Sequence, residues 1–430
     1  MLIGEIEKII KNKTKEGFIY PRYDGHSFYN ILPTIFALFG KDLGKPTLPQ
    51  EIYQDYAGRN KKLILFLIDG FGYDQFIRLS RELPFLKNFA RGGKVFPITS
   101  IFPSTTSAAL TTIHSGLSPQ EHGLLEWYVY FDEIDQVIQT LPFSPLGRMQ
   151  PPEMLQMAGV DPEILFSGKT IYPKLKDEEI TPYLFQEEKY LQSSYTRLVT
   201  KGANIVTWRR LTDLMSGLRQ FVSGADPPFC TGVYFDGLDH QGHEFGKFSQ
   251  EHLTVAQEFF EVLQKEFIEK IEPELARDLI ILLTADHGQI NVDPSATTYL
   301  NDYKEVVENL AFSQNNKQIL PWGSPREVFL KIKEEKVEEV FLFLQKEFKS
   351  KALVIKSREA FKQGLFGVGS PHIKFFDRIG DLLIIPFGNQ TIWYEYLPGE
   401  RLEFKGCHGG LSKEEMLIPF GIVKASELQK

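Results

Sequence analysis

Short runs of apolar residues set the strongest constraint on the fold of this chain. They read KLILFLI at 62–68, CTGVYF at 230–235 and DLIILLT at 278–284, and DLLIIP at 381–386 is a fourth candidate. Runs that are apolar throughout, rather than alternating, are typical of strands buried on both faces of a parallel sheet. Residues 252–271 between two of these runs carry helical periodicity. Strands that alternate with helices predict an α/β fold with a mostly parallel central sheet.

Two stretches interrupt this alternation. Residues 125–200 mix aromatic, proline and charged residues, and residues 295–375 hold two amphipathic pieces and a turn rich in glycine, proline and serine. We interpret both as insertions that lie over the sheet edge as cap segments. Residues 1–60 are predicted to form an N-terminal extension that packs on the core, and residues 61–430 to form the main domain.

The charge balance argues against one broad class of partner. The chain has 48 Lys and Arg against 56 Asp and Glu, which gives a net charge of −8. Because no basic residues cluster on the scale that phosphate tracking needs, a nucleic-acid polymer is not the expected partner. The longest apolar runs, such as LILFLI at 63–68, are far too short to cross a bilayer, so no membrane partner is expected.

The N-terminus and the cysteines bear on the cellular compartment. Residues 1–18 have the pattern of an amphipathic helix and lack the apolar stretch of a signal peptide. Cys230 and Cys407 do not make a disulfide framework. We therefore expect a cytoplasmic protein.

Each of the three main runs leads into residues that can bind a metal ion. These residues are Asp69 after the first run, Asp236, Asp239, His240 and His243 after the second, Asp286 and His287 after the third, and His408 in a glycine-bounded turn near the C-terminus. Taken singly, such an Asp is usually a turn or cap residue and such a His lies at the surface. Taken together, at the sheet edge where open α/β folds carry their sites, they predict a divalent metal site. Zinc is the most natural ion, and manganese and magnesium are alternatives.

The cluster after the second run contains two candidate pairs. Asp239 and His243 are four residues apart, as are Asp236 and His240, so each pair lies on one side of a helical turn. The two pairs point in different directions, and only one is expected to face the metal. We favour Asp239 and His243 because Gly242 allows the backbone to come close to an ion. Asp236 is then a cap or supporting residue, and His240 lines the pocket.

A run of four hydroxyl residues, Ser104 to Ser107, lies in the segment FPSTTSAALTT at 102–112. Ser and Thr at this position accept hydrogen bonds from the free N–H groups of a helix N-terminus. A helix N-terminus also favours an anion, so the same run can hold a nucleophile. The segment alone leaves both interpretations open.

At this point the chain resembles the alkaline phosphatase superfamily, and within it the type I phosphodiesterase/nucleotide pyrophosphatase branch and phosphonoacetate hydrolase. Single motifs of this kind are weak signals, but here they occur in the order of the family. The matching motifs are LFLIDGFG at 65–72, the PSTT loop with SGLSPQEHG at 115–123, DHQGHEFG at 239–246, TADHG at 284–288 and CHGG at 407–410. The resemblance implies an alkaline-phosphatase-like three-layer sandwich with inserted cap segments.

The resemblance also implies a site with two divalent metal ions. One ion would be held by Asp239, His243 and His408. The other would be held by the remaining ligands of the family pattern, which are Asp69, Asp286, His287 and the hydroxyl of the nucleophile. In the family the nucleophile lies ten residues before the Gly of a Ser/Thr-Gly-Leu-x-Pro element, and counting back from Gly116 gives Thr106.

The implied reaction is hydrolysis of a small phosphate ester or nucleotide-like substrate through a phosphothreonine. A bound dication stabilises a threonine alkoxide, which is otherwise a poor nucleophile. Ser107 is expected to offer its backbone N–H to a phosphoryl oxygen. Phe71 and Trp127 are candidates to stack on the leaving group, although either fits a core position equally. Ala109 is a departure, because the resemblance implies an Asn there that donates to the phosphoryl group.

Other reactions and roles share this scaffold. A sulfatase is disfavoured because neither cysteine lies in the required sequence context, and a phosphomutase because its nucleophile segment differs. A phosphomonoesterase usually needs extra cations, and no Arg or Lys lies near the PSTT loop in sequence. A phosphonate hydrolase and a catalytically dead metal-binding scaffold stay open. Arg326 and Arg378 could contact substrate, but a structural role is favoured for both.

Overall fold

A seven-stranded sheet forms the centre of the computed structural model, which describes residue 4 and residues 17–58, 61–147 and 150–430. In spatial order its strands are β2 (Lys94–Thr99), β18 (Leu417–Lys424), β9 (Leu279–Thr284), β1 (Lys62–Ile68), β8 (Phe229–Phe235), β6 (Thr181–Glu187) and β7 (Asn204–Trp208). Strand β18 runs antiparallel to both of its neighbours, and the other pairs are parallel. The predicted α/β fold with a mostly parallel sheet is confirmed, and so are its strands at 62–68, 229–235 and 279–284.

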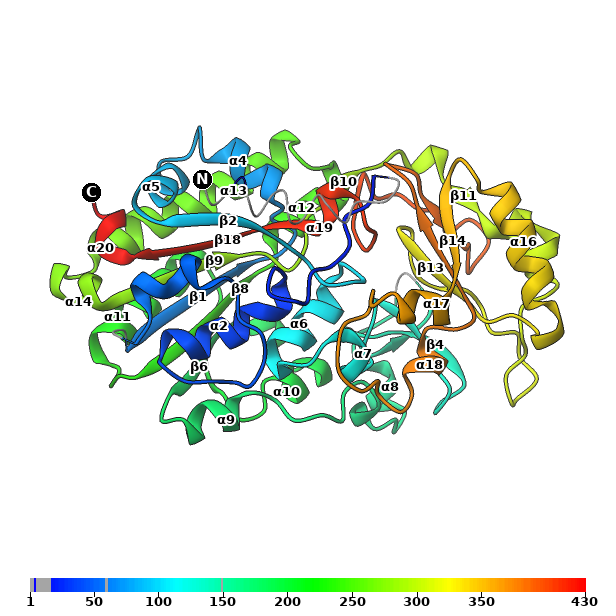
Figure 1. The fold of residues 1–430 in the computed structure, drawn as a ribbon, viewed down its shortest axis with the longest axis horizontal. Helices are drawn as coiled ribbons and strands as arrows, with labels where there is room; N and C mark the ends of the chain where they lie inside the picture. Colours follow the sequence, from blue (N-terminus) through cyan, green and yellow to red (C-terminus); the bar gives the residue numbers. More distant parts are fainter. Residues whose placement is uncertain (1–3, 5–16, 59–60, 148–149) are drawn as a thin grey trace.

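Helices cover both faces of this sheet, which gives the three layers expected from the resemblance. Figure 1 shows α4, α5 and α13 on one side and α2, α6, α9 and α10 on the other. The main helices are α2 (Ile31–Leu38), α4 (Tyr73–Leu79), α5 (Pro84–Gly92), α6 (Thr106–Ser115), α9 (Tyr172–Asp177), α10 (Ser194–Val199), α11 (Leu211–Gly224), α12 (Gly237–Phe245) and α13 (Gln250–Val262). The helix predicted over 252–271 corresponds to α13 and the helical turns that continue to Lys270.

A second seven-stranded sheet, antiparallel throughout, lies beside the first (Figure 1). Its strands, in spatial order, are β14 (Ala352–Lys356), β15 (Leu382–Pro386), β13 (Glu327–Leu330), β12 (Trp322–Ser324), β3 (Tyr128–Phe131), β4 (Gln136–Gln139) and β5 (Ser144–Pro145). Helix α16 (Val337–Glu347) contacts β14 and buries Val340 and Leu344 in a separate apolar cluster. Two segments far apart in the sequence therefore build one sheet.

The structure divides the predicted insertions differently from the sequence. Residues 128–145 do join the second sheet, but strand β6 at 181–187 belongs to the main sheet, so 125–200 is not one insertion. The fourth predicted core strand, at 381–386, is β15 of the second sheet. It pairs antiparallel with β13 and β14. The prediction that it joins the parallel sheet is wrong.

The N-terminal segment contacts the main sheet and the C-terminal loop. Ile19 donates its backbone N–H to the carbonyl of Leu411, and Arg22 donates its backbone N–H to Thr99 Oγ1, both at 2.9 Å. Most of the amphipathic helix predicted over 1–18 lies outside the described residues. Within the described part of the chain, the helices are all too short or too polar to span a bilayer.

A buried ion pair links the second sheet to the loop that carries His408. Arg326 lies in the turn between β12 and β13, and Glu415 lies in the short helix α19 (Lys413–Met416). Both side chains are fully buried, and the guanidinium donates to both carboxylate oxygens at 2.9 and 2.8 Å. Glu415 also accepts the backbone N–H groups of Gly410 and Ser412. Arg326 therefore has a structural role.

Replacing Arg326 with methionine is expected to lower the free energy of unfolding by about 3–5 kcal/mol, because Glu415 is left buried without its partner. Urea unfolding followed by circular dichroism measures this change. Arg209→Met is the matched control, since Arg209 pairs with Glu188 on the surface, and it should leave the unfolding midpoint unchanged. Equal unfolding midpoints for the two variants would contradict the prediction that the buried Arg326–Glu415 pair stabilises the fold.

Candidate active site at the carboxyl ends of the main strands

The predicted metal-binding residues meet at one end of the main sheet. Asp69 follows β1, Asp286 and His287 follow β9, and α12 begins directly after β8. His408 follows β17 (Gly406–Cys407), which pairs with β10 (Ile290–Asn291). Parallel strands place their carboxyl ends at a common edge, so residues far apart in sequence converge there.

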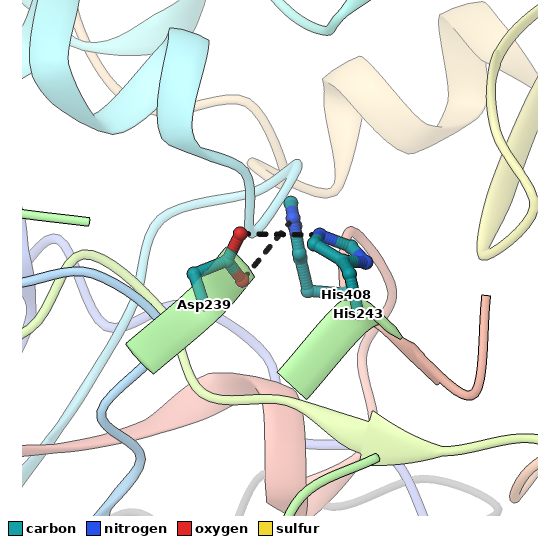
Figure 2. A group of neighbouring side chains, drawn as sticks. All are labelled: Asp239, His243 and His408. Carbon is teal, nitrogen blue, oxygen red and sulfur yellow. Dashed lines mark ion pairs between the residues drawn. The ribbon is translucent and has the colours of Figure 1, made fainter. Parts of the chain in front are cut away.

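The first group consists of Asp239, His243 and His408. Its ligand atoms all lie within 4.8 Å of one another. Figure 2 shows that both histidine rings point toward the Asp239 carboxylate. His243 Nε2 lies 3.2 Å from Oδ2 and His408 Nε2 lies 3.9 Å from Oδ1. Between the two pairs considered from the sequence, the structure brings Asp239 and His243 into the cluster.

The second group surrounds His287. His287 Nε2 lies 3.4 Å from Asp69 Oδ1 and 3.5 Å from Asp286 Oδ2. Asp69, Asp239 and His287 again have ligand atoms within 4.8 Å of one another, so Asp239 lies between the two groups. The His287 and His408 rings stack with centroids 3.7 Å apart.

All three histidines are held in the same way. The Nδ1 atoms of His243, His287 and His408 lie 2.7, 3.0 and 3.1 Å from the carbonyl oxygens of Gly406, Gly288 and Ser104. A carbonyl oxygen can only accept a hydrogen bond, so each Nδ1 carries a proton, and each Nε2 is the ring atom that faces the carboxylates. Backbone contacts of this kind fix the tautomer of metal-binding histidines.

The charges of the site fit divalent cations. Burial and the neighbouring carboxyls of Asp286 and Asp239 raise the pKa of Asp69 well above its usual range. Within the described residues, the basic side chains in contact with these three carboxyls are histidines, without a Lys or Arg. Asp286 Oδ2 is buried and accepts no hydrogen bond from the described residues. A cation would relieve the repulsion and satisfy this oxygen.

Thr106 is the hydroxyl residue that reaches the site. It is the first residue of α6, and its Oγ1 lies 3.1 Å from His287 Nε2 and 3.5 Å from each carboxylate oxygen of Asp69. Ser104 instead donates its hydroxyl to the Gly410 carbonyl, at 2.8 Å. The run of hydroxyls therefore contains one residue at the metal-binding groups and one that ties the loop to the C-terminal glycine turn.

The two residues predicted to contact the substrate have different outcomes. Phe71 is fully buried against Phe76 and Phe260, and it does not line the cavity at the site. Its predicted stacking role is wrong, because the turn after β1 directs the ring into the core. The side chain of Ser107 is buried as well, and its hydroxyl finds no partner in the described part of the chain. Only its backbone N–H, near the start of α6, stays a candidate donor.

Other sequence candidates have clear positions. Asp236 accepts hydrogen bonds from Lys189, at 2.9 Å, and from the Tyr190 hydroxyl, outside both groups. Ala109 is buried. Arg378 is buried and donates to the carbonyls of Gly123 and Ile164, so it is structural.

The structure shows a further reason for a glycine at position 242, beside the predicted close approach to an ion. A side chain at Gly242 would collide with Gln289, whose Oε1 lies 1.8 Å from where a Cβ would stand. Gln289 donates to Asp239 Oδ1 at 2.7 Å and to its carbonyl at 3.1 Å. The sequence analysis missed Gln289, although it lies only two residues after His287 in the same strand-end segment.

Tyr234 is a second residue that the sequence analysis missed. It lies on β8, and its hydroxyl donates to Asp69 Oδ2 on the neighbouring strand. Tyr234→Phe keeps the ring and removes this donor, so we expect metal affinity and kcat/KM to fall about 10- to 100-fold. Metal titration and steady-state kinetics measure both quantities.

Tyr190→Phe is the matched control for this prediction. Tyr190 also lines the cavity, but its hydroxyl donates to Asp236, outside the metal-binding groups. Its variant should retain most of the metal affinity. An equal loss in both variants would mean that the Tyr234 contact does not orient Asp69.

A cavity of about 1000 Å³ opens on these residues. Asp69, Thr106, Asp239, His243 and His408 all line it, as does the exposed ring of Trp127 at the start of the second sheet. Lys189 is the only Lys or Arg among its lining residues in the described ranges. That ammonium already lies 2.9 Å from carboxylate oxygens of both Glu187 and Asp236.

Comparisons with solved structures identify the same fold. Murine ectonucleotide pyrophosphatase / phosphodiesterase 5 is similar with a TM-score of 0.60 and 14% identity over 84% of this chain and 88% of that chain. It has also been solved as an inactive variant in complex with AMP. Phosphonoacetate hydrolase from Sinorhizobium meliloti 1021 is similar with a TM-score of 0.59 and 16% identity, over 86% of this chain and 91% of that chain.

Sequence comparisons identify a relative and a family. A venom phosphodiesterase from Macrovipera lebetinus is 25% identical over 271 residues, which cover 62% of this chain. The matched region spans only 30% of that enzyme's length. The sequence pattern of the family described as type I phosphodiesterase / nucleotide pyrophosphatase matches residues 63–411. Since that match covers most of the chain and runs from the strand before Asp69 to the turn after His408, the chain belongs to the type I phosphodiesterase/nucleotide pyrophosphatase family.

Proposed function

We propose that this protein is a metal-dependent phosphodiesterase that hydrolyses a small phosphate diester or pyrophosphate-type substrate with Thr106 as the nucleophile. The observation that carries the proposal is the position of Thr106 Oγ1, 3.1 Å from His287 and 3.5 Å from Asp69 at the head of α6. The family membership agrees with this reaction class. The murine relative solved with AMP and the hydrolase solved with phosphonoacetate agree with a small-molecule substrate.

Two divalent ions would bind to this arrangement, with zinc favoured and manganese or magnesium as alternatives. Asp239, His243 and His408 would hold one ion, and Asp69, Asp286, His287 and Thr106 the other. When bound, such ions stabilise a deprotonated hydroxyl and the charge that develops on phosphoryl oxygens.

The residues of the chain have distinct tasks in this scheme. Thr106 Oγ1 forms a bond to phosphorus while the bond to the leaving oxygen breaks, and the leaving group departs as an alcohol. Water then hydrolyses the phosphothreonine and restores the hydroxyl. The backbone N–H groups of Thr106 and Ser107, which have no acceptor inside α6, would donate to a non-bridging phosphoryl oxygen.

The scarcity of cations favours a diester over a monoester. A monoester carries an additional charge on its terminal oxygens, and enzymes that bind it need further positive groups. Lys189 is the one basic side chain in the described cavity lining, and two carboxylates already neutralise it. A diester therefore matches the charge of this cavity better.

The direct test compares three substrates under identical conditions. Zinc-loaded protein is assayed on bis(p-nitrophenyl) phosphate, p-nitrophenyl phosphate and p-nitrophenyl sulfate. We expect the diester to have the highest kcat/KM and EDTA to abolish its turnover. A rate on the monoester equal to or above that on the diester would contradict the diesterase proposal. The expected cytoplasmic location is tested separately by cell fractionation.

A further inference from the structure

The cavity extends well beyond the metal-binding groups. From Thr106 it continues between the main sheet and the helices α2, α6, α9 and α10. We call this inner part the apolar chamber. Its walls from the helices are Leu32, Ile35, Leu110, Ile113, Leu175 and Val199. Protein interiors are close-packed. A cavity of about 1000 Å³, the volume of the chamber and the polar site together, rarely persists beside a core unless something occupies it.

The main sheet provides the floor of the apolar chamber, in part through strand β8. Strand β8 is central, between β1 and β6, yet its alternate residues Cys230, Gly232 and Tyr234 are partly exposed. The intervening residues of the same strand are buried. In a central parallel strand both faces are normally covered. Here one face opens on the chamber, where Cys230 is small and Gly232 makes room for the Leu184 side chain of β6, whose Cδ2 lies 2.8 Å from where a Cβ of residue 232 would stand.

Two pairs of polar side chains near the apolar chamber already contact each other, whereas the buried Thr231 hydroxyl on β8 has no partner in the described part of the chain. The Tyr172 hydroxyl contacts His114 Nδ1, and the Tyr195 hydroxyl lies 3.0 Å from Thr111 Oγ1. Burial lowers the pKa of His114 to about 4, so its ring is neutral. A nucleobase or sugar inside the chamber would find few partners for the hydrogen bonds to water that it loses, which is unfavourable. A hydrocarbon has no such requirement.

We propose that the apolar chamber binds the hydrocarbon chain of a lipid-like phosphate ester, whose phosphoryl group lies at Thr106. This inference rests on the proposed phosphodiesterase function and specifies its substrate class. One continuous cavity joins the polar site to the chamber, so one molecule with an anionic head and an apolar chain matches both parts. Each methylene buried in the chamber should strengthen binding up to about fourfold.

The test uses monoalkyl phosphates as inhibitors of bis(p-nitrophenyl) phosphate hydrolysis. Butyl, octyl and dodecyl phosphate are compared below their micelle-forming concentrations. The inhibition constant is expected to fall about two- to fourfold for each added methylene until the chamber is full. An inhibition constant that does not change with chain length would overturn the proposal and leave the phosphodiesterase function standing.

Filling the chamber provides the matched variants. Cys230→Phe should abolish the chain-length dependence while bis(p-nitrophenyl) phosphate is still hydrolysed, since Cys230 lies outside the metal-binding groups. Cys230→Ala, which keeps the space, should behave as the wild type. Leu175→Trp on the opposite wall is a second filling variant in case the first does not fold. If inhibition still depends on alkyl-chain length in both filling variants, the alkyl chain binds outside the chamber and the proposal is overturned.

A binding measurement separates the two proposals. The fluorescence of cis-parinaric acid reports chain binding without turnover, and dodecyl phosphate should displace it from the wild type and from Cys230→Ala. Loss of parinarate binding in Cys230→Phe, together with inactivity on every diester, would support the chamber and contradict the phosphodiesterase. No parinarate binding to the wild type would overturn the chamber, whatever the catalytic result.

Discussion

Replacing Thr106 with alanine is expected to lower kcat/KM on bis(p-nitrophenyl) phosphate by at least about 10³-fold, because the variant lacks the attacking oxygen. Thr106 Oγ1 is the hydroxyl that lies within 3.5 Å of both His287 and Asp69. The metal content and the circular dichroism spectrum of the variant should stay close to those of the wild type. The loss would then belong to the reaction and not to folding.

The neighbouring hydroxyl provides the control for this prediction. Thr105 is the buried N-cap residue of α6 and lines the cavity, but its side chain makes no capping hydrogen bond and its hydroxyl bonds to Glu126, outside the metal-binding groups. Thr105→Ala should therefore keep activity within about tenfold of the wild type. Thr106→Ser, which retains a hydroxyl, should keep part of the activity. If Thr105→Ala were dead and Thr106→Ala active, the nucleophile would be assigned one residue too late.

Replacing His243 with alanine is expected to remove one of two bound zinc ions and to lower kcat/KM by at least about 100-fold. His243 provides one of the three side chains of its group, and its ring is already oriented by the Gly406 carbonyl at 2.7 Å. Three protein ligands and water are a common zinc arrangement, so loss of one ligand leaves the ion weakly held. Elemental analysis of dialysed protein measures the zinc content.

His240→Ala is the matched control for the metal prediction. His240 lies on the same helix and lines the cavity, but it belongs to neither metal-binding group in the described part of the chain. Its variant should retain both ions. Anomalous scattering from zinc-loaded crystals provides an independent check, with one peak expected at each group in the wild type. A loss of zinc from His240→Ala and not from His243→Ala would reverse the choice between the two pairs.

Sequence patterning predicted the central strands well because burial on both faces leaves a simple signature. The same signature explains the error at β15. Its residues Leu383 and Ile385 pack in the main core, while Leu382 and Ile384 pack in the cluster under α16. The run is therefore apolar throughout, although it lies in an antiparallel sheet. An apolar run indicates that both faces of a strand are covered. It does not indicate which strands pair with it, because those strands lie far away in the sequence.

Strand β6 was missed for the opposite reason. Its sequence TPYLFQE includes proline and three polar residues, Thr181, Gln186 and Glu187, and its burial is mixed, because part of the strand faces the cavity. A core strand that borders an open space loses the continuous apolar pattern. Strand β8 lines the same space. The sequence therefore concealed a strand that lines the cavity.

The metal-binding residues could be predicted because topology brings strand ends together regardless of the details of packing. Supporting contacts could not be predicted in this way. Tyr234 reaches Asp69 from the neighbouring strand, and Gln289 reaches Asp239 from a different strand end. The opposite error occurs at Phe71, which is two residues from Asp69 in the sequence but points into the core. Closeness in sequence does not set the direction of a side chain.

The most direct test of the account is to trap the covalent intermediate. Zinc-loaded protein is mixed with bis(p-nitrophenyl) phosphate, quenched in acid within the first turnover, digested and analysed by tandem mass spectrometry. We predict a p-nitrophenyl phosphoryl group on Thr106, absent from Thr106→Ala and from protein treated with EDTA. A modification on Thr105, Ser107 or another residue, or rapid turnover without any covalent species, would contradict the account.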